Sequence, residues 1–295
     1  MYAERNMSTA PAGSRYSQEP FVRSILCVTD FSQGSMTAFA HALMLAMNLR
    51  YEFTLLHASK AGERGEEWPR VPRVRQLLER WGYLDPGSPQ QAVFQKVAVQ
   101  VKKVRADTEN ALGAMLEYLE RNPTDLVVLG TRGSRGVASW LRPSLPEAAI
   151  KRSRTMTLFV PGAARGFVSL ERGGFTLKHI LVPVNSVPNP HPAVTYAFRT
   201  AVFSSEEIVR MSLLHVGSAG EAPKLNFPER PYLSWEMLHR TGNVAEEIVK
   251  AGAQSDLIVM TTEGREGILD GLRGSVTRDV LRSAPCPVLT VPLGR

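Results

Sequence analysis

The stretch TDLVVLGTRG at residues 124–133 returns later in the chain as SDLIVMTTEG at residues 255–264. Each copy runs from a polar residue and an aspartate through an apolar run to a polar segment that ends in glycine. Continuous apolar runs of this length predict β-strands covered on both faces, as in parallel sheets. Their repetition predicts that the chain contains two copies of one α/β unit.

Three further pairs of segments repeat around this one, and all are short apolar runs typical of strands. The pairs are RSILCVTDFS (23–32) with KHILVPVNSV (178–187), FTLLHAS (53–59) with MSLLHVGS (211–218), and MTLFVP (156–161) with PVLTVP (287–292). The repeat therefore spans nearly the whole chain. A length of 295 residues suits two domains of ordinary size, each able to bury a core.

We expect the first domain over residues 21–162 and the second over residues 176–295, with a linker over residues 163–175. Residues 1–20 are polar and lack the apolar core of a signal peptide, so we expect a disordered leader. Strands that alternate with helical patterns predict, in each domain, a doubly wound parallel α/β sheet of about five strands with helices on both faces. Ligands of such sheets bind beyond the carboxyl ends of the strands.

The positive charge of the chain is concentrated in one segment. Residues 60–105 hold ten Lys or Arg and five Asp or Glu, and so carry five of the seven net positive charges. His57 and His215 are 158 positions apart but Asp125 and Asp256 only 131, so the first copy has 27 extra residues in this region. We interpret residues 60–105 as a basic helical insertion with a solvated face, although the run VAVQVKKV at its end (97–104) is a candidate strand. Because acids are interspersed and no groove-reading motif is present, nucleic acid is not an expected partner.

The composition excludes several classes of protein. With 43% hydrophobic residues, a mean hydropathy of −0.13 and no apolar run near the roughly 18 residues that a membrane span needs, the chain is not a membrane protein. We expect it in the cytoplasm. Cys27 and Cys286 lie in apolar runs, which predicts buried, reduced thiols. The six histidines lack the spacing of metal ligands, so no metal site is expected.

Polar residues stand where several predicted strands end. Asp30 follows the first strand and Asn185 its counterpart in the second copy, and either side chain could cap the next helix. The strand within each opening stretch leads into a loop of the form G-x2-G-x9-P-S in the first copy and T-x2-G-x9-G-S in the second. Glycine loops that lead into a helix offer N–H groups to an anion, although one such loop alone is more often a turn.

Taken together, the strand-end Asp, the LLH motif, the glycine loop and the closing APCPVLTVP resemble the universal stress protein family, in two tandem copies. The resemblance implies a sheet of order 3-2-1-4-5 in each domain and a role in the stress response. It also implies that ATP or another adenine nucleotide binds, and Mg²⁺ is compatible with ATP. The strand-end Asp and the residue after LLH would lie near the adenosine, and the glycine motif around the phosphates.

The two copies depart from the family's motif at different places. The first has Pro143 in place of the last glycine, and proline cannot donate an N–H to phosphate. The second has Asn185 for Asp and Thr261 for the first glycine, and both retain hydrogen-bonding groups. A lost donor to phosphate costs about 1.5–3 kcal/mol and an exchange of Asp for Asn about 1 kcal/mol, so we predict the better site in the second domain. The implied nucleotide-binding residues are Asn185, Val216, Thr261, Gly264, Gly274, Ser275 and Val276 in the second domain and, more weakly, Asp30, Ala58, Gly130, Gly133 and Ser144 in the first.

Three functions are open at this point. The leading one is a cytoplasmic stress-response protein, not an enzyme, that binds ATP and acts through nucleotide-dependent contacts with partners; slow ATP hydrolysis would be compatible with it. The second is a nucleotide-free tandem interaction module whose sites have decayed. The third, an adenine nucleotide hydrolase, is the weakest, because the chain lacks a pyrophosphate loop of the SGGxDS kind and a positioned general base.

Further expectations concern packing. The edge strands MTLFV and PVLTV should join the two domains about a pseudo-twofold axis, and a homodimer is a further assembly to test. His57 and His215 each stand near the end of an apolar strand, which favours a structural hydrogen bond, and Asn243 is expected to cap a helix. Trp68, Trp81 and Tyr83 are expected to pack the insertion onto the sheet.

Overall fold

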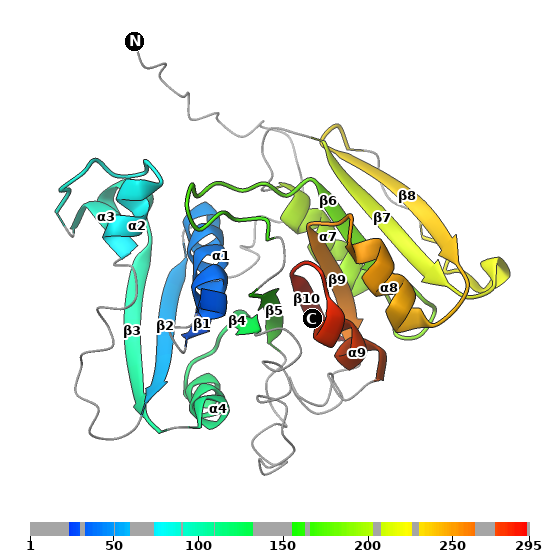
Figure 1. Ribbon diagram of the computed structural model, residues 1–295, viewed down its shortest axis with the longest axis horizontal. Coiled ribbons are helices and arrows are strands. Elements are labelled where there is room, and N and C mark those ends of the chain that lie inside the picture. The colour runs from blue at the N-terminus through cyan, green and yellow to red at the C-terminus, as the bar shows by residue number, and fades with distance from the viewer. Residues whose placement is uncertain are drawn as a thin grey trace.

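The structure, a computed structural model, describes residues 24–29, 33–49, 51–59, 74–89, 91–108, 110–131, 155–162, 166–202, 208–225, 230–262 and 275–293. Its strands form one ten-stranded sheet in the order β3-β2-β1-β4-β5-β10-β9-β6-β7-β8 (Figure 1). The strands of the first half are β1 (Ser24–Thr29), β2 (Glu52–Ser59), β3 (Gln100–Asp107), β4 (Leu126–Thr131) and β5 (Met156–Pro161). Those of the second half are β6 (His179–Pro183), β7 (Val209–Val216), β8 (Leu233–Arg240), β9 (Leu257–Thr262) and β10 (Val288–Pro292).

The strand pairings confirm the predicted fold class. Neighbouring strands within each half are parallel, and each half has the order 3-2-1-4-5. The single antiparallel pairing among the described strands joins β5 to β10. The two domains therefore share one continuous sheet.

The junction between β5 and β10 has a two-fold relationship. Leu158 and Leu289 hold the same position in the repeated segments MTLFVP and PVLTVP, and they are paired with each other across the junction. Antiparallel pairing of equivalent residues places a pseudo-twofold axis between them. The Thr290 hydroxyl adds a hydrogen bond to the carbonyl oxygen of Thr157 at 3.2 Å. The expected contact through these two strands is thus present.

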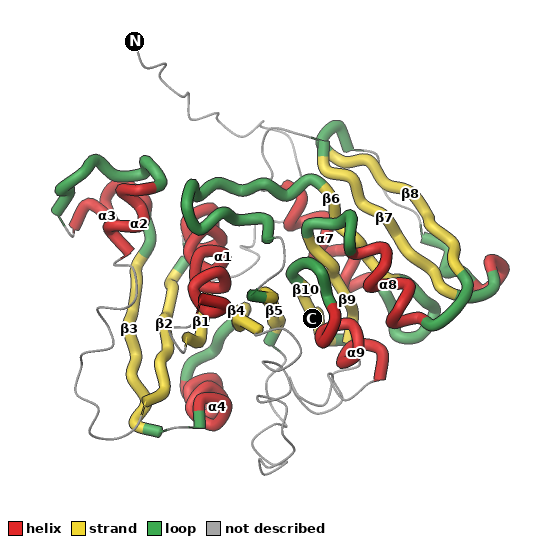
Figure 2. The backbone as a smooth tube through the Cα atoms, viewed as in Figure 1, coloured by secondary structure: helices red, strands yellow, loops and turns green. Residues whose placement is uncertain are grey.

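Helices cover both faces of the sheet, as a doubly wound fold requires (Figure 2). The helices that pack on one face are α1 (Gln33–Leu49), α2 (Val74–Arg80), α3 (Gln91–Val97) and α7 (His191–Val202). Those on the other are α4 (Ala111–Arg121), α8 (Val244–Gly252) and α9 (Ser275–Ser283), and a short 3-10 helix, η2 (Ala219–Glu221), follows β7. Within the described ranges, none of the helices has the length and apolar character that crossing a membrane requires.

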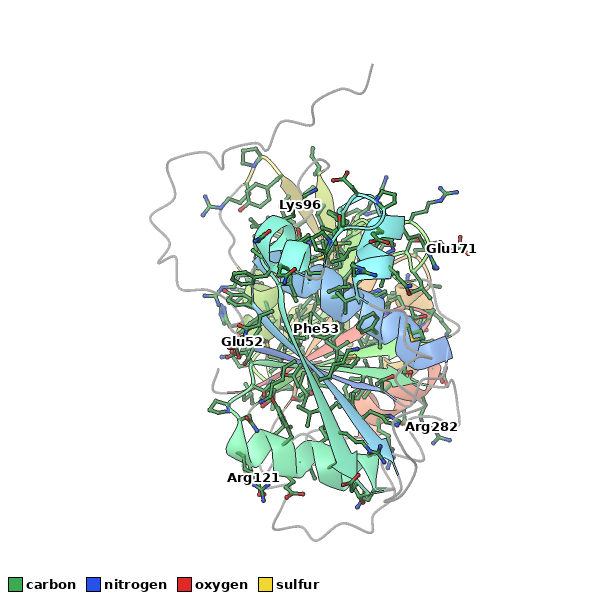
Figure 3. All side chains as sticks on the ribbon, turned by 90° about the vertical axis from the view of Figure 1, so that its left-hand side faces the viewer. Glu52, Phe53, Lys96, Arg121, Glu171 and Arg282 are labelled. Carbon is green, nitrogen blue, oxygen red and sulfur yellow. The ribbon has the colours of Figure 1, made fainter. Side chains whose placement is uncertain are left out.

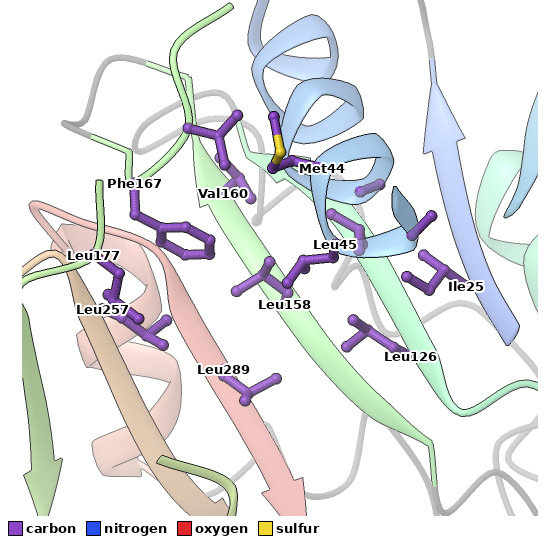
Figure 4. Close-up of a cluster of buried hydrophobic side chains, with 14 of the residues drawn as sticks. Ile25, Met44, Leu45, Leu126, Leu158, Val160, Phe167, Leu177, Leu257 and Leu289 are labelled. Atoms are coloured by element: carbon purple, nitrogen blue, oxygen red, sulfur yellow. The ribbon is translucent and has the colours of Figure 1, made fainter. Parts of the chain in front are cut away.

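The buried side chains on the first face form one cluster that includes residues from both halves (Figure 4). Leu158 and Leu289 lie in it, together with Phe167 and Leu177 from the segment that connects the halves. Cys27 is also buried there, and burial raises the pKa of its thiol well above the ordinary value. Cys27 and Cys286 are both buried thiols that form no disulfide within the described residues, as predicted.

The connection between the halves packs against the first domain. We call residues 166–178 the strap. The backbone N–H of Phe167 donates to Nε2 of His41 on α1 at 3.1 Å, and the Trp81 indole donates to the carbonyl oxygen of Leu170 at 3.1 Å. Gly173 has a φ of +63°, and a Cβ there would lie 2.5 Å from the Trp81 ring. The strap is therefore fixed both to α1 and to the insertion.

The insertion is helical over a shorter range than predicted. Its helices α2 and α3 end at Val97, whereas the expected helical insertion extended to residue 105. Residues from Gln100 onward form β3, which confirms the candidate strand VAVQVKKV and pairs in parallel with β2, so the cations there belong to the shared sheet. These cations are Lys102, Lys103 and Arg105. Trp81 is buried as expected, Tyr83 is 43% exposed, and Trp68 lies outside the described residues.

Candidate functional site

The predicted residues of the second domain stand at the carboxyl ends of neighbouring strands. Val216 ends β7, Thr261 is the penultimate residue of β9, and Asn185 follows β6 by two residues. Because β6 and β7 pair with Pro183 opposite Leu214, Asn185 comes level with Val216. In Figure 1 the arrowhead of β7 marks this edge. The structure thus brings these three residues to one edge of the sheet.

Helix α9 contributes the other part of the predicted site. It begins at Ser275, and Val276, its second residue, is partly buried against the core on that face. Gly264 and Gly274 lie outside the described residues, as do Arg265 and Arg273. A nine-residue helix leaves its first N–H groups without partners inside the helix, which favours an anion near its start.

A buried histidine positions the backbone before Asn185. His215 is 2% exposed, and its Nδ1 and Nε2 lie 3.3 Å and 3.1 Å from the carbonyl oxygens of Val184 and Ser218. In the first domain, Nδ1 of His57 lies 2.9 Å from the carbonyl oxygen of Thr29, the residue before Asp30. Both histidines therefore make the predicted structural hydrogen bond, each to the residue that precedes a strand-end site residue.

Thr261 makes a contact that its sequence did not reveal. Its Oγ1 accepts a hydrogen bond from the backbone N–H of Ala193 at 3.3 Å, and Ala193 lies in the first turn of α7. The threonine that replaces the motif's glycine thus satisfies one of the N–H groups at the start of that helix. It also ties β9 to the helix that follows β6, at the point where the sheet's winding reverses.

Asn185 does not cap α7, contrary to one of the two roles considered for it. Its Oδ1 accepts from the backbone N–H of Ser186 at 2.8 Å, and the side chain is exposed. The N–H of His191 at the start of α7 donates instead to Oδ1 of Asn189, at 3.0 Å. An amide oxygen has two lone pairs, so Asn185 keeps one acceptor position and both amide hydrogens for another partner.

The first-domain site is described only in part. Ala58 lies near the carboxyl end of β2, and Gly130 is the penultimate residue of β4. Asp30, Gly133 and Ser144 lie outside the described residues, together with Pro143. At this edge, Oγ1 of Thr29 lies 3.0 Å from Oγ of Ser35 and links the end of β1 to α1.

A second group of polar side chains lies nearer the amino ends of the strands. Nε2 of His179 is 2.8 Å from Oγ of Ser212, which donates to Oε1 of Glu236 at 2.8 Å. Ser212 is fully buried, so it cannot meet a substrate, and the group serves to tie β6, β7 and β8 together. Asn243 caps α8 as predicted, because its side chain accepts from the N–H of Glu246 at 3.2 Å. In the part of the chain that the structure describes, no three His, Cys, Asp or Glu side chains cluster as metal ligands would.

Comparison with known proteins gives consistent matches. A model of the universal stress protein family matches residues 22–161 and 228–292. The universal stress protein Rv2005c of Mycobacterium tuberculosis is 23% identical over 250 residues, which cover 75% of this chain and 81% of that protein. The crystal structure of a universal stress protein from Archaeoglobus fulgidus aligns with a TM-score of 0.53 at 15% identity, over 91% of this chain and 96% of its own. A functionally unknown protein from Pseudomonas aeruginosa, PA1789, aligns with a TM-score of 0.55 at 14% identity, over 92% of each chain.

The two structural likenesses show a shared fold. The family model goes further, since its two matched segments fall one in each half of the sheet and together make up well over half of the chain. The chain therefore belongs to the universal stress protein family, as a tandem of two such domains in one continuous sheet.

Proposed function

We propose that the second domain binds an adenine nucleotide, ATP in the first place, and that the protein acts in the stress response through nucleotide-dependent contacts with partners. The observation that carries this proposal is the placement of Asn185, Val216 and Thr261 at the carboxyl ends of β6, β7 and β9. Doubly wound sheets bind their ligands at this edge, beside the point where the winding reverses.

The adenosine would lie between the ends of β6 and β7. Asn185 has an acceptor position and two amide hydrogens left for the base or the ribose, after its bond to Ser186. Val216 is partly buried and offers an apolar contact to the face of the adenine. His215 would act as a positioning residue, since it holds the carbonyl oxygen of Val184 just before Asn185.

The phosphates would lie at the start of α9. The N–H groups of its first turn and the partial positive charge of the helix end favour a phosphate there. Gly264, Gly274 and Ser275 complete this part of the proposal from the sequence. Mg²⁺ would accompany ATP through the phosphate oxygens and water, as it usually does in nucleotide sites.

A nucleotide-free interaction module is the second candidate, and two contacts favour it. Oγ1 of Thr261 already accepts from Ala193, and Oδ1 of Asn185 from Ser186. Both residues that depart from the family's motif are thus engaged inside the protein. An enzymatic role has weaker support, because the motifs that adenine nucleotide hydrolases need are missing from the sequence.

Calorimetric titration of the full chain with Mg·ATP distinguishes the candidates. We expect wild type to bind, and Gly274→Pro to bind at least tenfold more weakly, because proline removes an N–H donor worth about 1.5–3 kcal/mol. Pro143→Gly in the first domain is the matched control and should leave the second-domain affinity unchanged. Absence of binding by wild type would reject the nucleotide proposal, and equal binding by Gly274→Pro would reject the choice of domain. Release of labelled phosphate from bound ATP tests the enzymatic alternative.

A further inference from the structure

The insertion borders an open cavity that has no part in the nucleotide proposal. The cavity has a volume of about 810 Å³ and lies between α2, α3 and the edge strand β3. This edge faces the viewer in Figure 3, where Lys96 marks α3 and Arg121 marks α4. We call it the insertion pocket. Its volume is in the range typical of small-molecule sites, about 300–1,000 Å³.

The walls of the insertion pocket combine an apolar part, which is the larger, with a polar part. Val74 comes from α2, Val93 and Phe94 from α3, and Val101 from β3. Phe94 is 63% exposed, although Ala92, two positions earlier on α3, is buried in the core. An exposed aromatic ring at the mouth of an apolar cavity can gain contact area from a ligand that covers it.

Two cations line the same cavity. They are Arg75 on α2 and Lys103 on β3, and the described residues that line the pocket include no carboxylate. Arg75 forms an ion pair with Glu79 one turn along α2, with Nε 3.6 Å from Oε1, a separation too long for a hydrogen bond. Side chains alternate along a strand, so the neighbouring Lys102 points to the opposite face, where its Nζ lies 5.8 Å from the centre of the Tyr118 ring. Of these two adjacent lysines, only Lys103 therefore lines the pocket.

In the residues that the structure describes between β7 and β8, the second copy has no counterpart to this arrangement. There β7 ends at Val216 and β8 begins at Leu233, whereas in the first copy β2 ends at Ser59 and β3 begins at Gln100. The shorter connection leaves no room for two helices equivalent to α2 and α3. The insertion pocket is thus a property of the added segment rather than of the repeated unit.

We propose that the insertion pocket binds a small amphiphilic carboxylate, meaning an apolar chain that carries one carboxylate. The chain would lie against the valines and Phe94, and the carboxylate would meet Arg75 and Lys103. Charge complementarity decides the sign of the ligand, since both ionic groups of the lining are positive. The apolar part of the lining favours a ligand in which an apolar chain is attached to the carboxylate.

The test is calorimetric titration of the full chain with decanoate below its micelle concentration. Acetate supplies the charge without the chain, and decyltrimethylammonium supplies the chain with the opposite charge. We expect decanoate to bind at least tenfold more tightly than either. Absence of decanoate binding, or equal binding of the cationic amphiphile, would overturn the proposal.

Variants locate the binding on the protein. Lys103→Gln should weaken decanoate about fivefold, as the loss of a partly solvated ion pair does. Lys102→Gln, one residue away on the opposite face, is the matched control and should have no effect. Phe94→Ser should also weaken decanoate, while Gly274→Pro should leave it unchanged and so separates this pocket from the proposed nucleotide site. Equal losses in the two lysine variants would show that only the general charge of the edge matters, which would refute the assignment.

Discussion

Acidification should destabilise the protein through His41. This histidine is fully buried on α1, its Nδ1 donates to the carbonyl oxygen of Thr37 at 2.8 Å, and its Nε2 accepts from the N–H of Phe167 on the strap. Burial lowers the pKa of His41 from 6.5 to about 4, although the hydrogen bond to Thr37 opposes the shift. A proton on Nε2 would point at the N–H of Phe167 and break this hydrogen bond, so the folded structure favours the neutral imidazole ring.

The sign and size of the effect follow from proton linkage. Between pH 6.5 and 4 the unfolded chain holds the proton on this residue and the folded chain does not, so the free energy of unfolding falls as the pH falls. Each pH unit in that interval is worth about 1.36 kcal/mol. The His41 contribution to the free energy of unfolding should therefore be fully present above pH 6.5. It should be smaller by about 2 kcal/mol at pH 5 and by about 3 kcal/mol below pH 4.

Denaturant unfolding at pH 7.5, 6.5, 5.5 and 5.0 measures this contribution as a difference between variants. His41→Gln should unfold more easily than wild type at pH 7.5, by about 1–3 kcal/mol for a disturbed buried hydrogen bond, and should lose part of the pH dependence. His191→Gln changes an exposed histidine and serves as the control that keeps the wild-type slope. If wild type and His41→Gln decline in parallel with pH, the assignment to His41 is wrong.

Three further predictions concern local contacts, each measured by denaturant unfolding. Gly173→Ala should lower the free energy of unfolding by more than about 2 kcal/mol, because the new Cβ would meet the Trp81 ring. Gly174 also has a positive φ but faces open space, so Gly174→Ala should lower it by only about 1 kcal/mol. Equal losses in the two variants would contradict the packing of the strap. Thr261→Val should lower the free energy of unfolding by about 1–2 kcal/mol and speed amide exchange at Ala193, whereas Thr261→Ser should retain the hydrogen bond. Identical exchange at Ala193 in both variants would contradict this hydrogen bond. Asn243→Ala should cost about 1 kcal/mol through the lost cap of α8, Asn243→Asp should cost less, and no loss in either would show that the cap is replaceable.

The repeated strands were predictable because their chemistry is local. Runs such as ILCVT and LIVM are apolar over their whole length, and only a sheet covered on both faces buries them completely. The pairing of β5 with β10 also followed from the sequence, since these strands end the two copies and remain at the edge of each. The histidine hydrogen bonds were also predictable from the sequence, because His57 and His215 recur at matched places near the ends of strands.

The contacts that sequence reasoning missed join residues far apart in the chain. Thr261 looked like a departure from a glycine motif, and its bond to Ala193 depends on how close β9 comes to α7 in the folded sheet. Asn185 and Asn189 are equally good caps by composition, and only the path of the chain after β6 decides that Asn189 contacts the start of α7. The charge count alone assigned Lys102, Lys103 and Arg105 to the helical insertion, whereas the run VAVQVKKV (97–104) correctly indicated a strand there.

Because β5 and β10 pair at Leu158 and Leu289 within one chain, the association of the two halves does not depend on protein concentration. Two separate chains joined through such edges would come apart as their concentration fell, whereas here the strap holds both edges in one molecule. A pair of identical chains must also carry every substitution twice. In this protein Phe159 faces Val288 while Thr157 faces Thr290, so one half can change its ligand site or acquire an insertion while the other half keeps its own sequence.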